Sequence, residues 1–163
     1  MSNDSVPQLL PPPKGDTAEA EKYTKQLCEL IADNKVLVAH TDLKKFDLAS
    51  LQDHYRMDLG DYEVEVSHSK QPDNGKDFFV MLFNNLKKIQ ENGATCTNKV
   101  ILAYIDLTEE QFKTFKNTAF EQQEAQRKKE EAQRFRQAII PIDQLLTTIS
   151  NQPETPEPQV IPS

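Results

Sequence analysis

The chain has 163 residues, a net charge of −7 and 37% hydrophobic residues, which predicts one modest domain. This acidic balance argues against a nucleic-acid-binding surface spread over the whole protein. The four glycines form no phosphate-binding loop, and no apolar run reaches the roughly 18 residues expected of a membrane span.

The two ends of the chain are predicted to be disordered, over residues 1–16 and 151–163. Each end carries four of the ten prolines and has no apolar periodicity. The N-terminus shows no secretory signal pattern, and Cys28 and Cys96 lie far apart in the sequence. We therefore expect reduced thiols and an intracellular, cytoplasmic protein, with a nuclear location left open.

The first predicted element is a helix that begins at Asp16 or Thr17 and ends near Asp33. A short apolar strand follows over residues 36–39. Residues 41–54 are ambiguous, because their leucines and Phe46 could line a short helix.

Residues 62–68 alternate between apolar and polar side chains and predict a strand. The apolar positions in residues 77–91 follow an i, i+3, i+4 rhythm and predict a helix that ends before Gly93. Residues 99–106 form a nearly continuous apolar run, which is typical of a central strand covered on both faces. These three elements together predict a right-handed βαβ crossover.

Thr108 and Gln111 form a capping-box pattern that opens another helix, with Phe112 and Phe115 as its inward anchors. The helix becomes almost wholly polar from residue 121 and continues to about Ala138, close to a break at Pro141.

The predicted fold class is α/β, with α+β as an alternative, built on a small three- or four-stranded mixed sheet flanked by helices. Residues 17–120 form the expected compact domain. Residues 121–150 form a protruding polar helical arm with an apolar end.

Acidic side chains are concentrated in residues 53–70, on and before the second predicted strand. Two carboxylates on one strand face can hold a divalent metal. An acid, a short gap and a second acid on an apolar strand resemble the restriction-endonuclease-like nuclease core, written PD-(D/E)xK. The resemblance implies Mg²⁺ bound by Asp58 and Glu65, with Lys70 acting on water. The motif is broken, since Ser67 stands where the lysine belongs and Met57 where the proline belongs. The alternative interpretation of these acids is an exposed strand face that provides solubility.

The leading functional hypothesis is a non-catalytic interaction or regulatory module that needs no cofactor and binds a partner protein through the helical arm. Residues 113–136, which include most of the polar part of the arm, carry a net charge of +3 against −7 for residues 1–112, and the apolar end of the arm has helical spacing suited to a partner groove. Self-association and folding back onto the body are both left open. The expected partner-binding residues are basic residues of the arm and apolar residues of its end: Arg127, Lys128, Lys129, Ile142, Leu145, Leu146 and Ile149. The alternative function is a Mg²⁺-dependent nuclease acting on nucleic acid.

Overall fold

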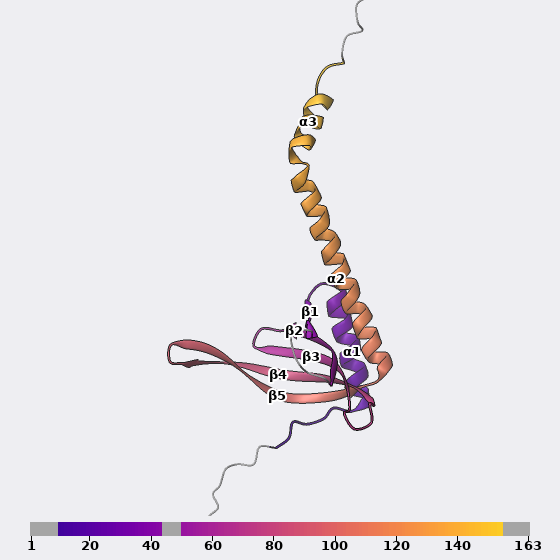
Figure 1. Ribbon diagram of the computed structural model, residues 1–163, viewed down its shortest axis with the longest axis vertical. Coiled ribbons are helices and arrows are strands. Elements are labelled where there is room, and N and C mark those ends of the chain that lie inside the picture. Colours follow the sequence, from indigo (N-terminus) through magenta and orange to yellow (C-terminus); the bar gives the residue numbers. More distant parts are fainter. Residues whose placement is uncertain (1–9, 44–49, 155–163) are drawn as a thin grey trace, which may run out of the picture. The chain divides into compact units, whose positions relative to one another are not determined.

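The computed structural model describes residues 10–43 and 50–154. Its elements make an α+β fold and are shown in Figure 1. In chain order they are α1 (Thr17–Ala32), β1 (Val38–His40), β2 (Leu51–Asp58), β3 (Tyr62–Lys70), β4 (Asp77–Glu91), β5 (Ala94–Leu107), α2 (Glu109–Ala138) and α3 (Ile140–Ser150). Contacts divide the chain into two units after Gln123, and the two are described separately below. The disorder predicted for residues 1–9 and 155–163, and part of the ambiguous segment (residues 44–49), lie outside the described residues.

The sheet of the first unit is an antiparallel meander in the order β1-β2-β3-β4-β5. The predicted mixed sheet with a βαβ crossover is therefore wrong. Both predicted long strands exist, but β5 is an edge strand and not a central one. Strand β2 occupies the end of the segment that the sequence leaves ambiguous.

The predicted helix over residues 77–91 is the strand β4. Phe79 and Met81 point into the core, while Phe78 is exposed, so the side chains alternate with the period of a strand. Gly93 does not end a helix. Together with Asn92 it forms the two-residue turn between β4 and β5, in which Glu91 pairs with Ala94. Both turn residues have positive φ (53° and 79°), as a type I′ hairpin requires.

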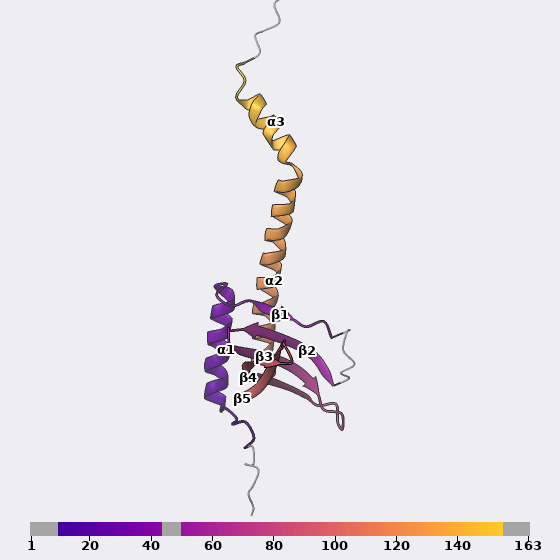
Figure 2. The ribbon, with the colours of Figure 1, turned by 90° about the vertical axis from the view of Figure 1, so that its left-hand side faces the viewer.

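Helix α1 and the first part of α2 cover one face of the sheet (Figure 2). The capping box around Asp16 opens α1, and Thr108 exchanges hydrogen bonds with Gln111 at the start of α2, as predicted. Phe112 and Phe115 of α2 are 3% and 0% exposed, which confirms them as inward anchors. Burying an aromatic or aliphatic side chain of this size contributes about 1.5–3 kcal/mol. The core therefore joins both helices to the sheet.

Gln122 ties α2 to the segment between α1 and β1, although the sequence places it in the exposed arm. Its side chain is 8% exposed. Its amide nitrogen donates to the carbonyl oxygens of Ile31 (3.0 Å) and Val36 (2.7 Å), and its amide oxygen accepts from the Val38 N–H (2.9 Å). The arm predicted to begin at residue 121 therefore contributes its second residue to the body.

The end of the N-terminal segment is attached to the edge strand β5. Tyr104 donates its N–H to the Pro13 carbonyl (3.1 Å) and accepts from the Gly15 N–H (2.8 Å). Lys14 also forms an ion pair with Asp106 at 2.7 Å. Residues 13–15 therefore make a short parallel pairing with the sheet inside the segment predicted to be disordered.

The second unit contains the rest of α2, followed by α3 and residues 151–154. Side chains from Ala125 to Ala138 are exposed, in keeping with the polar sequence of this helix. Helix α2 ends at Ala138, and Pro141 lies in the first turn of α3, so the predicted break is confirmed. Among the described helices, none is long and apolar enough to cross a membrane.

Candidate functional site

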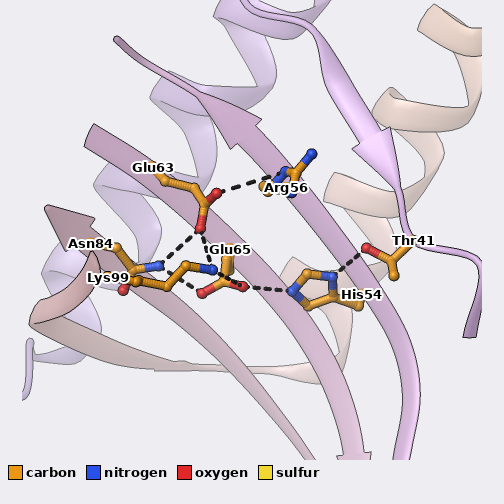
Figure 3. Close-up of polar contacts among 7 residues, drawn as sticks. All are labelled: Thr41, His54, Arg56, Glu63, Glu65, Asn84 and Lys99. Atoms are coloured by element: carbon orange, nitrogen blue, oxygen red, sulfur yellow. Dashed lines mark hydrogen bonds and ion pairs between the residues drawn. The ribbon is translucent and has the colours of Figure 1, made fainter. Parts of the chain in front are cut away.

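The sheet face opposite the helices carries a cluster of polar side chains from four strands (Figure 3). Strand β3 creates it by alternation: Val64 and Val66 point to the core, so Glu63 and Glu65 point to the other face. The register places Asn84 of β4 directly opposite Glu63. Lys99, from β5, reaches both carboxylates.

Each carboxylate of this cluster has short contacts to nitrogen atoms. The Lys99 Nζ lies 2.7 Å from Glu63 Oε1 and 3.2 Å from Glu65 Oε1. Asn84 donates from Nδ2 to Glu65 Oε2 at 2.6 Å, and His54 Nε2 lies 2.9 Å from Glu65 Oε1. Because a carboxylate only accepts, the proton of this last bond belongs to Nε2. The Thr41 hydroxyl, 2.6 Å away, can then donate to Nδ1 of His54.

The two carboxylates of the cluster are charged but largely shielded from water, whereas Lys99 and Arg56 are partly exposed. The side chains of Glu63 and Glu65 are 4% and 12% exposed. The hydrogen bond from His54 lowers the pKa of Glu65 to about 2, against the opposing effect of burial and with help from Asn84 and Lys99. Burial opposes the charge of Lys99, but its hydrogen bonds to Glu63 and Glu65 outweigh this and raise the pKa of Lys99. The exposed, solubilising acid face expected from sequence is therefore wrong at these two residues.

In the cluster, the charge of each carboxylate is balanced by nearby cations. Lys99 bridges both acids, and Arg56 approaches Glu63 at 3.7 Å. No group of three or more acidic, histidine or cysteine side chains with the geometry to hold a metal ion occurs in residues 10–43 and 50–154. The arrangement satisfies buried charges within a sheet that has helices on its other face.

The three residues of the nuclease hypothesis are not brought together. Asp58 is the exposed last residue of β2 and pairs with Glu63, whereas Glu65 pairs with Arg56. Lys70 is the exposed last residue of β3. It lies five residues from Glu65, which is about 17 Å along a strand and on the opposite face. The βαβ unit on which the resemblance depends is also replaced by antiparallel strands.

Two further histidines join acids at the core side of the sheet. His40 Nε2 lies 2.6 Å from Asp53 Oδ1, and Lys116 of α2 holds the other oxygen at 2.9 Å. Burial opposes the charge of Asp53, but its bonds to Lys116 and His40 prevail and lower the pKa of this carboxyl. His68 stacks on Phe79 and bonds Asp77 at 2.8 Å, so its imidazole is partly buried and has a hydrogen-bond partner.

No protein-family model matches this sequence, and neither a curated protein nor a solved structure is significantly similar to it.

The predicted partner-binding residues all lie in the second unit, on two helices. Arg127 is engaged within α2, where its guanidinium contacts Glu124 at 3.0 Å and Glu131 at 2.6 Å. On α3, the apolar side chains expected to bind a partner are all more than half exposed: Ile142 58%, Leu145 60%, Leu146 56% and Ile149 55%. Helix α3 has no buried residue. Among the described residues of its own unit (124–154), its apolar face therefore has nothing to pack against.

The sequence reasoning missed the partners of Glu65 and the role of Gln122. His54, Asn84 and Lys99 come from three other strands, and only the register of the sheet brings them together. One signal in the sequence pointed to buried acids: Glu63 and Glu65 alternate with valines in a predicted strand. In the structure this strand has neighbours on both sides. For Gln122 the signal was weaker: it continues the helical spacing of the buried residues Phe112, Phe115 and Ala119, but its own side chain is polar.

Proposed function

We propose that this chain is a non-catalytic interaction module that binds a partner protein through the C-terminal part of α2 and through α3. The observation that carries the proposal is the apolar face of α3. Its anchors are four branched side chains with i, i+3, i+4, i+7 spacing, the pattern that a helix presents to a groove or to another helix: Ile142, Leu145, Leu146 and Ile149.

Exposure of this face is energetically unfavourable, which supports its use as a binding surface. Each leucine or isoleucine that moves from water into an interface contributes about 1.5–3 kcal/mol. Contiguous exposed apolar patches on proteins mark interaction sites more often than scattered single residues do. The basic side chain of Lys129 lies on the preceding helix and would add electrostatic guidance toward a partner.

The first test is a capture experiment with the full chain and a truncation that starts at Glu124. A deletion from residue 121 would remove Gln122 and damage the body, so its result would be ambiguous. The truncated chain should keep its far-UV circular dichroism signature of a folded sheet but lose the captured protein. Capture that survives this truncation unchanged would reject the assignment.

A finer test keeps the chain whole. Leu145→Gln with Leu146→Gln removes two anchors but retains good helix formers. The matched control is Thr147→Gln with Thr148→Gln, which alters neighbouring side chains of the same helix without removing an apolar anchor. The leucine pair should abolish capture and the threonine pair should preserve it. Equal capture by both variants would contradict the proposal.

The nuclease alternative is not carried forward. It required Asp58, Glu65 and Lys70 to meet at one metal ion, and Glu65 instead has three nitrogen partners of its own.

A further inference from the structure

We propose that the partner bound by these helices is a second copy of the same chain, in a parallel two-stranded coiled coil over residues 125–149. This inference rests on the proposed function and specifies its partner. The apolar side chains of the second unit repeat every seven residues, the period of a left-handed coiled coil. In the heptad abcdefg, the a positions are Ala125, Ala132, Ile139 and Leu146, and the d positions are Lys128, Phe135, Ile142 and Ile149.

Four of the five large members of this seam are exposed within the second unit, and the fifth, Ile139, is partly buried. Phe135 is 63% exposed, Ile142 58%, Leu146 56% and Ile149 55%. The seam is therefore strong in its C-terminal half, whereas two alanines and a lysine make it weak in its N-terminal half. The binding energy should come mainly from residues 135–149.

The seam crosses the junction of α2 and α3 at Ile139, whose backbone is not α-helical (φ −97°, ψ 4°). The Ile139 N–H bonds the Phe135 carbonyl at 3.0 Å, and the Asp143 N–H bonds the Ile139 carbonyl at 2.7 Å. Both are i→i−4 bonds, so helical geometry continues on either side of Ile139. Pro141 falls at a c position, on the outer surface of the proposed coil.

The charges beside the seam select the parallel orientation. Glu124 and Glu131 occupy g positions, and Lys129 and Arg136 occupy e positions. In a parallel pair, each g residue meets the e residue five positions later in the other chain. Glu124 then faces Lys129 of the second copy, and Glu131 faces its Arg136. In an antiparallel pair, g meets g and e meets e, which would oppose acid to acid and base to base.

The single polar seam position makes the proposal testable by a gain of affinity. Lys128 at d would face Lys128 of the second copy, which costs stability. Lys128→Leu should therefore lower the dissociation constant of the dimer by about tenfold. This ratio corresponds to about 1.4 kcal/mol, the gain expected when each chain adds one partly buried apolar side chain to the seam. The matched control Glu130→Leu, at an outward f position, should leave the dissociation constant unchanged.

Sedimentation equilibrium of the full chain reads the association directly. A reversible species of twice the 18.6 kDa chain mass is expected. Glu131→Lys and Arg136→Glu should each weaken it by about tenfold, since each replaces two attractive pairs per dimer with repulsive ones. An equimolar mixture of the two variants should recover the affinity, because every cross-chain pair is then attractive. Failure of the mixture to recover would overturn the charge pairing.

Disulfide cross-linking tests whether the two helices of the dimer are parallel. In a Cys28→Ser, Cys96→Ser background, Lys128→Cys should form a disulfide dimer rapidly on mild oxidation, whereas Glu130→Cys should not. Equal or absent cross-linking at both positions would overturn the parallel register.

The outcomes separate this inference from the function on which it rests. The full chain could stay monomeric at about 100 μM, a concentration well above the dissociation constants of specific interfaces. If its leucine-pair variant then loses a different captured protein, the coiled coil is rejected and the interaction module is retained. A dimer that survives the leucine pair unchanged defeats both.

Discussion

Gln122→Ala should destabilise the body of the protein more than any other single change to a surface-helix glutamine. Removing the Gln122 amide leaves the Val36 carbonyl and the Val38 N–H without the hydrogen bonds that this side chain makes at 2.7 and 2.9 Å. The Ile31 carbonyl keeps a second donor, the Asn34 N–H at 3.0 Å. Two buried groups without partners, at about 1–3 kcal/mol each, predict a loss of about 2–6 kcal/mol in the free energy of unfolding.

The control for this prediction is the neighbouring Gln123→Ala, which makes the same chemical change in the same helix turn. Urea denaturation followed by far-UV circular dichroism measures both variants, since the chain has no tryptophan. Gln122→Glu adds a second readout. At pH 7 its carboxylate would face two carbonyl oxygens, so it should be at least as destabilising as the alanine variant. If Gln122→Ala and Gln123→Ala agree within about 0.5 kcal/mol, these bonds contribute nothing and the reasoning fails.

Three further predictions concern the sheet and the start of α2. Because the pKa of Glu65 is lowered to about 2, the ionised side chain contributes up to about 3 kcal/mol to the free energy of unfolding above pH 4.5, and this contribution is lost as the pH falls toward 2. Glu65→Gln should therefore flatten the dependence of the free energy of unfolding on pH between 4.5 and 2. A variant whose profile runs parallel to that of the original protein would refute this prediction. Lys99→Met should cost about 2–4 kcal/mol because it leaves the buried acids short of a cation, whereas exposed Lys87→Met should cost almost nothing in the same denaturation assay. Thr108→Ala should lower the free energy of unfolding by about 1 kcal/mol through loss of the cap, and no measurable change would contradict the capping role.

The helices were predictable because their ends carry local chemical signals. Asp16 and Thr108 cap through hydrogen bonds to residues three positions away, and Pro141 cannot continue α2. Such signals act within one turn and need no knowledge of the rest of the fold. The same locality explains why both helix starts were found correctly.

Strand β4 was misread because its apolar residues satisfy two periods at once. Phe78, Phe79, Leu82 and Phe83 fit a helical stripe, but the run between them is also apolar, which allows a strand with apolar side chains on both faces. The Asn92-Gly93 pair was the deciding signal, since it is the preferred sequence of a type I′ hairpin. Read in that way, it predicts two strands joined by a tight turn.

The polar cluster could not be assembled from sequence because its members are separated by register. Glu65 and Lys99 are 34 positions apart and meet only because β3, β4 and β5 lie side by side. The apolar face of α3, in contrast, was predictable, since its spacing lies within a single helix.

Site-specific photo-cross-linking in the native cell tests the binding role of α3 most directly. A photoreactive residue in place of Leu146, on the apolar face, should give a strong cross-linked protein band. The same residue in place of Gln144, on the polar side of the helix, should give little. Equal labelling from both positions, or no protein adduct at Leu146, would contradict the assignment of α3 as the interaction surface.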